Sequence, residues 1–216
     1  MVDMRGERAL GLRERKKRKT RATLINAAVG LCDSQGFDAT TVDQIAAVAD
    51  VSSRTFSRYF ATKEAIALAL IDEILDMAAA ELARQPLDLG PYEASRRAWV
   101  GMAHVTTRAG ADGLGAERLL QILRIVMTST TLRQAVVEYR ADVVDVVLAR
   151  RMGVAPGDRR VRLISSVWCA VLMTALESAV DDAKSLVSIT VDDLVAAFEA
   201  TYAEFASEMA GIGQPV

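Results

Sequence analysis

Proline, histidine and cysteine are scarce in this chain of 216 residues, which contains four, one and two of them respectively. Because proline interrupts helices and sheet ladders, so few prolines leave room for long helices. Apolar residues make up 51% of the chain, and few of their runs alternate as half-buried strands do. We therefore predict an all-α protein of about nine helices, with enough residues to bury a sizeable core.

The single histidine, His104, has no cysteine or carboxylate set around it at the spacing of zinc ligands, and no nucleophile or kinase motif is present. We therefore expect no enzyme activity, no metal site and no cofactor. Cys32 and Cys169 lie far apart in apolar contexts, as reduced cytoplasmic thiols do. The basic N-terminus lacks the apolar core of a signal peptide, and the most apolar window, 163–176, is too short to span a membrane. We expect a cytoplasmic protein.

One stretch, TTVDQIAAVADVSSRTFSRYFATK at 40–63, predicts two short helices joined by a tight turn. Thr41 can cap the first helix with Gln44 as its capping-box partner. Asp50 lies at the turn, where a left-handed residue is needed. A serine then caps the second helix, whose donor side chains face outward while Phe56 and Phe60 face inward. This pattern fits a helix-turn-helix that enters a major groove, although it also fits a plain amphipathic hairpin.

The run VADVSSRTFSRYFATKEA, with LINAAVGLCDSQGFDATTVDQIAAVA before it, resembles the DNA-binding region of the tetracycline-repressor (TetR) family over about 21–70. The segment LRQAVVEYRADVVDVVLARRMG is similar, more weakly, to actinobacterial regulators of the mycofactocin type. The first resemblance implies that Thr41, Tyr59 and Lys63 grip DNA phosphates. Arg54 and Ser57 depart from the residues common in that family, so no operator can be transferred from a relative.

Charge is divided unevenly along the chain. Residues 1–63 carry 12 Lys or Arg against 7 Asp or Glu, and residues 64–216 carry 14 against 21. The run RERKKRKTR at 13–21 predicts a flexible basic arm that reaches phosphates or the minor groove, the alternative being a solvated helix face. The predicted DNA-binding residues are Arg15, Lys16, Lys17, Arg18, Lys19, Arg21, Thr41, Ser52, Ser53, Arg54, Thr55, Ser57, Arg58, Tyr59 and Lys63.

The predicted domains are a disordered basic N-terminal arm at 1–12, a three-helix DNA-binding domain at 13–62, a helical-bundle regulatory domain at 63–210 and a tail at 211–216. Glycine and proline clusters separate the helices of the second domain. We expect the helices at about 63–83, 92–108, 116–127, 131–152, 158–179 and 191–209, with a flexible connection at 110–115.

Soft and aromatic side chains in the central helices suggest a pocket for an apolar or amphipathic effector, although such stripes are more often core. The weaker resemblance suggests an acyl-CoA. The candidates are Trp99, Met102, His104, Leu123, Met127, Tyr139, Trp168, Cys169 and Met173.

The last two predicted helices are strongly apolar. The TetR resemblance implies that they form a four-helix dimer interface, while the alternative is that they close the protomer's own core. The candidates are Val167, Val171, Leu172, Ala175, Leu194, Phe198, Thr201, Tyr202 and Phe205.

Together these features predict a homodimeric transcriptional regulator, a repressor, that binds a palindromic operator, is released by a small effector and does not associate with membranes. The alternative is a helical ligand- or partner-binding dimer whose helix-turn-helix no longer reads DNA specifically.

Overall fold

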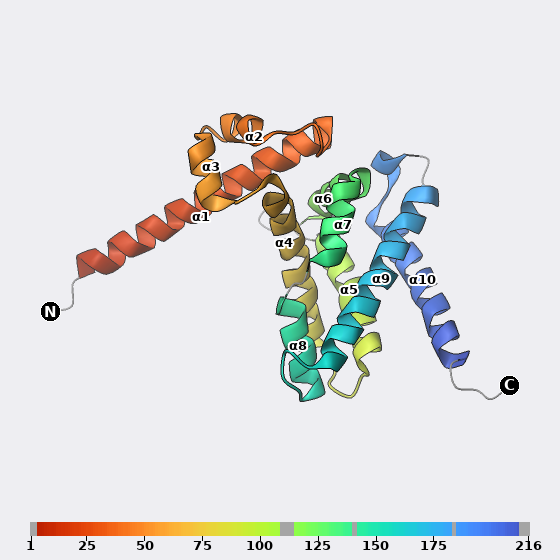
Figure 1. Cartoon of the computed structure of the whole chain (residues 1–216). Helices are drawn as coiled ribbons and strands as arrows, with labels where there is room; N and C mark the ends of the chain where they lie inside the picture. The colour runs from red at the N-terminus through yellow and green to blue at the C-terminus, as the bar shows by residue number, and fades with distance from the viewer. Residues whose placement is uncertain (1–3, 109–114, 140–141, 183–184, 212–216) are drawn as a thin grey trace. The chain divides into compact units, whose positions relative to one another are not determined.

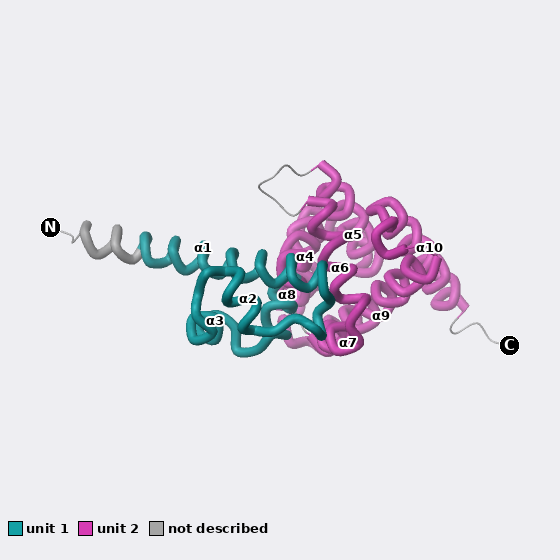
Figure 2. Tube along the Cα trace, turned by 90° about the horizontal axis from the view of Figure 1, so that it is seen from above, with its two compact units in different colours: residues 1–70 teal, residues 71–216 magenta. Residues whose placement is uncertain are grey.

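The computed structural model describes residues 4–108, 115–139, 142–182 and 185–211, and these residues are helical with no strand among them (Figure 1). They form ten α-helices and one 3-10 turn, where the sequence predicted about nine helices. The chain divides into two compact units, with the boundary between Leu70 and Ile71 (Figure 2). We placed this boundary at 62/63, so the first two turns of the following helix belong to the first unit.

The first unit contains α1 (Met4–Gln35), α2 (Val42–Val48), α3 (Ser53–Tyr59) and the start of α4 (Lys63–Arg84). Helix α1 is followed directly by Gly36, whose φ of 84° is the left-handed conformation that often terminates a helix. Thr62 caps α4 by accepting a hydrogen bond from the Ala65 backbone N–H at 3.2 Å. The buried core includes Leu24, Phe37, Ile45, Phe56 and Phe60, with Leu31 and Val51 half-buried beside them.

Helix α1 begins at Met4, so the expectation that residues 1–12 are disordered is wrong for residues 4–12. The basic run 13–21 continues the same helix, which agrees with the alternative of a solvated helix face and not with a flexible arm. Arginine, lysine and glutamate are good helix formers, and Arg18 pairs with Glu14 one turn away at 3.6 Å. The helix propensity of these residues therefore extends α1 through a segment that lacks an apolar stripe and for that reason was expected to be disordered.

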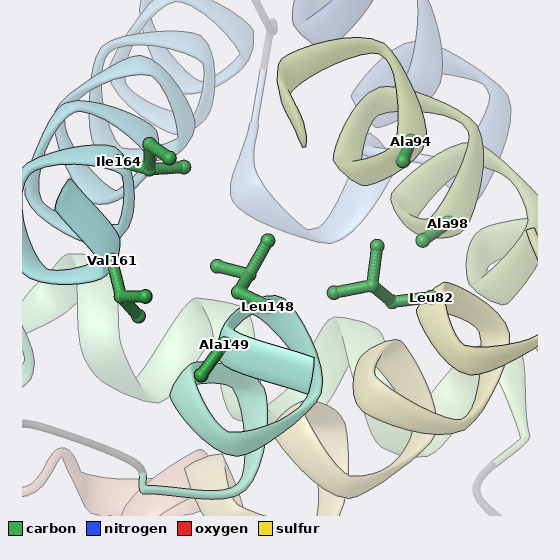
Figure 3. Close-up of a cluster of buried hydrophobic side chains, with 7 residues drawn as sticks. All are labelled: Leu82, Ala94, Ala98, Leu148, Ala149, Val161 and Ile164. Atoms are coloured by element: carbon green, nitrogen blue, oxygen red, sulfur yellow. The ribbon is translucent and has the colours of Figure 1, made fainter. Parts of the chain in front are cut away.

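The second unit contains the rest of α4, followed by α5 (Pro91–Arg108), α6 (Ala116–Thr128), α7 (Thr130–Glu138), α8 (Asp142–Met152), α9 (Arg159–Asp182), the 3-10 turn η1 (Leu186–Ser188) and α10 (Val191–Gly211). Helix α10 packs along α9 (Figure 1). Figure 3 shows side chains from α4, α5, α8 and α9 meeting in one buried cluster: Leu82, Ala94, Ala98, Leu148, Ala149, Val161 and Ile164. The predicted connection at 110–115 and the tail at 211–216 fall almost entirely outside the described residues.

The helix predicted at 131–152 is in fact two helices, α7 and α8. Tyr139 ends α7 in an extended conformation, with φ −69° and ψ 128°. Its hydroxyl donates a hydrogen bond to the carboxylate of Asp72 on α4. Tyr139 and Asp72 are 67 positions apart in the sequence. Their contact gives a physical reason for the break between α7 and α8, which the local periodicity could not predict.

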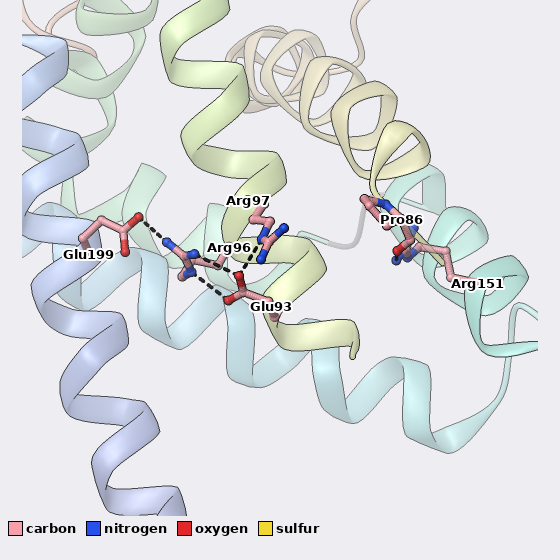
Figure 4. Close-up of polar contacts among 6 residues, drawn as sticks. All are labelled: Pro86, Glu93, Arg96, Arg97, Arg151 and Glu199. Atoms are coloured by element: carbon pink, nitrogen blue, oxygen red, sulfur yellow. Dashed lines mark hydrogen bonds and ion pairs between the residues drawn. The ribbon is translucent and has the colours of Figure 1, made fainter. Parts of the chain in front are cut away.

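Two polar clusters tie the helices of the second unit together (Figure 4). Arg151 Nη1 donates to the carbonyl of Gln85 at 2.7 Å and Nη2 to that of Pro86 at 2.6 Å, so a cation covers the C-terminal end of α4. Arg96 on α5 binds Glu93 through two nitrogens and Glu199 of α10 at 2.6 Å. The second cluster fixes α10 against α5.

Candidate functional site

The α2–α3 hairpin has the local geometry of the predicted helix-turn-helix. The Gln44 backbone N–H donates to Thr41 Oγ1 at 3.2 Å, and the Thr41 N–H donates to Gln44 Oε1 at 2.9 Å, which confirms the capping box. Asp50 occupies the turn with φ 53°, the left-handed conformation that was predicted there. These local contacts fix the conformation of the turn that joins α2 to α3.

Helix α3 presents a mostly exposed row of donors. Ser52 is the N-cap and accepts a hydrogen bond from the Thr55 N–H at 3.1 Å. Arg54, Ser57 and Arg58 are exposed, whereas Thr55 is half-buried. The outward-facing side of α3 therefore consists chiefly of two guanidinium groups and small hydroxyls.

One residue at this surface was missed by the sequence reading. Ser53 Oγ donates to the carboxylate of Asp43 on α2 at 2.6 Å. Asp43 is exposed, so it adds an acceptor beside the donors of α3. Asp43 lies in the first turn of α2, ten positions before Ser53, and the tight hairpin brings the first turns of α2 and α3 together. This position in the sequence could have identified Asp43.

Aromatic rings hold two of the predicted phosphate-binding cations. The guanidinium of Arg58 lies 5.4 Å from the centre of the half-buried Tyr59 ring, and that of Arg21 lies 5.3 Å from the Phe60 ring. Such stacking orients a guanidinium while leaving its N–H groups able to bind phosphate. The other predicted cations of the basic run, Arg15, Lys16, Lys17, Arg18 and Lys19, lie exposed along α1.

Lys63 departs from the expected phosphate contact. Its ammonium donates to the Phe37 carbonyl at 2.8 Å and lies 4.2 Å from the centre of the Phe37 ring. The side chain is half-buried because it folds back over the loop that follows α1. In this conformation Lys63 joins the start of α4 to the α1–α2 loop rather than facing outward.

The second unit encloses a cavity of about 430 Å³ with walls from α4 to α10. Seven of the nine predicted pocket residues line it: Trp99, Met102, Leu123, Tyr139, Trp168, Cys169 and Met173. His104 does not, because it is two positions beyond Met102 on α5 and so falls on the exposed side of the helix. Met127 is buried one turn beyond Leu123 and lies instead against a separate small void.

The cavity wall is apolar except for a few groups, of which Asp145 on α8 and Ser165 on α9 were missed by the sequence reading. The Ser165 hydroxyl donates to the Asp145 carboxylate. Tyr139 also lines the wall. Its hydrogen bond to Asp72, together with burial and the charges of Asp72, Asp142 and Asp76, raises the pKa of Tyr139 to about 12. The tyrosine therefore stays protonated at neutral pH.

The predicted dimer residues divide between the protomer's interior and its half-buried rim. Val171, Ala175 and Phe198 are buried with Trp168 in one aromatic cluster, so these three cannot form a surface between protomers. Trp168 contacts Phe198 and Tyr202 edge-on, at 5.6 and 5.8 Å between ring centres, and its buried indole N–H has no hydrogen-bond acceptor among the described residues. The remaining candidates are half-buried: Val167, Leu172, Leu194, Thr201, Tyr202 and Phe205.

The outward faces of the last two helices carry small side chains in their middle turns and charged ones toward their ends. Exposed positions on α10 include Ala196, Ala200 and Ala203, and those on α9 include Ala170. Helix α9 is 24 residues long and, by length and composition alone, apolar enough to cross a membrane, a test that core helices also pass. Most of its half-buried apolar residues line the cavities of the second unit, and its exposed apolar side chains include Leu163 and Ala170.

Comparison with known proteins agrees with this geometry. The family described as bacterial regulatory proteins, tetR family, matches residues 24–70, which include α2 and α3. The HTH-type transcriptional regulator TcmR of Streptomyces glaucescens is 34% identical over 168 residues, which cover 74% of this chain and 73% of that protein.

Two solved structures share the fold. One is FadR of Thermus thermophilus, a TetR-family repressor in complex with lauroyl-CoA, with a TM-score of 0.51 at 24% identity over 91% of this chain and 98% of that one. The other is SmeT of Stenotrophomonas maltophilia in complex with triclosan, with a TM-score of 0.51 at 18% identity over 86% of this chain and 91% of that one. The level of identity to TcmR and the match over the helix-turn-helix place this chain in the TetR family of bacterial transcriptional regulators.

Proposed function

We propose that this regulator binds a specific palindromic DNA operator through α3 and represses transcription in the cytoplasm until a small ligand releases it. The observation that carries the proposal is the row of exposed donors on a capped α3, with Arg54 and Arg58 as its cations. An arginine can bind guanine through two hydrogen bonds in the major groove, so Arg54 is the candidate for base recognition. Tyr59, Arg21 and the helical basic run would then contact phosphates, which position the protein.

A homodimer follows from the geometry of DNA. Two reading helices must address half-sites roughly 34–36 Å apart, which one protomer cannot do. The exposed Leu163 and Ala170 of α9 and the exposed alanines of α10 support a dimer built on these two helices. The interface would use the outer faces of the helices rather than the buried Val171, Ala175 and Phe198.

The effector would occupy the cavity in the second unit. Helix α4 contributes Ile71, Ile74 and Leu75 to the cavity wall, and its first turns belong to the DNA-binding unit. A ligand that binds more tightly to a dimer whose two α3 helices do not match the operator half-sites shifts the population toward that form and away from DNA. The size of the shift is limited by the ratio of the ligand's affinities for the two forms of the dimer. The apolar wall suits an apolar or amphipathic compound, and we propose a role in regulation rather than in catalysis.

The first experiment is selection of genomic DNA fragments by the purified protein at about 150 mM salt, where sequence-independent binding is weak. We expect one palindromic motif. An Arg54→Ala variant should lose that motif, whereas Arg150→Ala, which removes an exposed cation from α8, should keep it.

Recovery of random fragments by a folded protein would contradict specific recognition. It would favour the alternative, in which the helix-turn-helix no longer reads sequence and the cavity alone serves the function.

A further inference from the structure

The charge of the cavity wall restricts what the cavity can hold. Among the described residues that line it, Asp145 is the only one charged at neutral pH. Asp145 is half-buried and receives a hydrogen bond from Ser165, but none of the described cations pairs with it. It lies in the first turn of α8, where the helix dipole attracts negative charge. The described part of the wall therefore holds one negative charge and no positive one.

Aromatic rings complete the same cavity. Trp99, Tyr139 and Trp168 all line it, and the faces of such rings attract cations. Asp72, which accepts the hydrogen bond from Tyr139, adds a second carboxylate near that ring. The half-buried Arg118 on α6 is outside the cavity wall and lies near Glu73. Carboxylates and aromatic ring faces therefore lie at or near the same cavity, and the described residues of its wall carry no positive charge.

From this arrangement we infer that the effector is a cationic amphiphile, with a compact apolar body that contains rings and a protonated amine placed beside Asp145. This inference rests on the proposed function, because it takes the occupant of the cavity to be the effector. A cation there would pair with a carboxylate that is otherwise costly to bury. A carboxylate or phosphate ligand would meet like charge without a balancing cation, which argues against an acyl-CoA.

The test uses three ligands of one shape and different charge: an anthracenyl methylamine, the corresponding anthracenyl methanol and anthracene carboxylate. Calorimetric titration of the full-length protein should give an affinity for the amine at least about tenfold above that for the alcohol, because a paired charge and its ring contacts together contribute more than about 1.4 kcal/mol. The carboxylate should bind most weakly.

Variants identify the group responsible. Asp145→Asn should abolish the preference for the amine. Ser165→Ala, which keeps the carboxylate, should retain the preference, as should the control Asp88→Asn, which removes an exposed charge outside the cavity wall. Thermal melts of each variant show that it is folded. Equal or tighter binding of the alcohol or the carboxylate, or an unchanged preference in Asp145→Asn, overturns the inference.

DNA binding is measured on the same preparations, so that the two proposals fail separately. A protein that selects one operator but is released by the neutral or the anionic compound keeps its proposed function and overturns the cationic effector. Loss of operator selection in the wild-type protein contradicts the proposed function itself.

Discussion

Lys63 is the residue whose observed contacts change its expected role most. Its ammonium binds the Phe37 carbonyl and ring within the DNA-binding unit. Lys63→Ala should therefore lower the free energy of unfolding by about 1–2 kcal/mol, the sum of a charge-assisted hydrogen bond and a cation–π contact. Urea denaturation of the variant beside Arg159→Ala, which removes an exposed cation, measures this difference.

The same variant separates a structural role from a phosphate contact. A lysine bound to phosphate contributes about one unit to the slope of log affinity against log salt. Because the ammonium is already bound to Phe37, we expect this slope to stay the same in Lys63→Ala. A slope that falls by about one unit with unchanged stability would restore the phosphate contact.

At Asp50, the backbone conformation determines which substitutions are tolerated. Its φ of 53° lies in the left-handed region, where a β-branched side chain is strained. Asp50→Val should cost about 1–2 kcal/mol in the free energy of unfolding, whereas Asp50→Gly should be close to neutral. Thermal melts of the two variants make the comparison, and equal losses in both would show that the aspartate side chain matters more than the backbone angle.

At the scale of elements, the Glu93–Arg96–Glu199 cluster joins α5 to α10 and should make stability depend on pH (Figure 4). The hydrogen bond from Arg96 is the largest of the effects that lower the pKa of Glu93 to about 2, from an ordinary value of 4.5. A depressed folded-state pKa stabilises the protein above the unfolded pKa, and this contribution is lost as pH falls from about 4.5 toward 2.

We therefore expect Glu93→Gln to be less stable than the wild type by about 1 kcal/mol at neutral pH, after allowance for solvent screening. The difference should shrink as pH falls below about 4.5, because the wild-type carboxyl then becomes protonated. Urea midpoints at several pH values test this. A difference that is constant with pH would mean that Glu93 acts through packing rather than charge.

Elements set by neighbouring residues could be predicted from the sequence. The capping box of α2, the Thr62 cap of α4 and the glycine end of α1 each depend on side chains within a few positions. Features set by distant contacts could not. The break at Tyr139 involves Asp72, and the fold-back of Lys63 involves Phe37, 26 residues earlier.

The candidate cavity shows the same division. Helical spacing identified most of its apolar lining, since those residues share the inner faces of their helices. The prediction also included His104, which was chosen by residue type although it lies on the opposite side of α5 from Met102. It omitted Asp145 and Ser165, which meet across two helices and become neighbours only in the folded unit.

At the scale of the whole molecule, the proposed dimer would use the outward faces of α9 and α10. Ala200→Glu places a charge on the exposed face of α10, where a dimer contact would have to bury it. We expect a folded monomer whose affinity for the operator falls by about a hundredfold or more, because the second reading helix is no longer tethered. Sedimentation and mobility-shift measurements report the two effects.

Ala83→Glu is the matched control, since it adds the same charge at an exposed position on α4. It should remain dimeric and bind the operator normally. Ala200→Glu protein that stays dimeric would place the interface elsewhere.

The position of the tryptophans gives the protein an optical reporter of its own. The chain has two, Trp99 and Trp168, and both line the cavity. Indole emission therefore originates at the cavity wall, and the DNA-binding unit contributes none of it. A change in emission when unlabelled operator is added could arise only if binding at α3 alters the surroundings of these two rings. Linkage requires that effector and operator influence each other equally, so this signal would follow their coupling without any added dye.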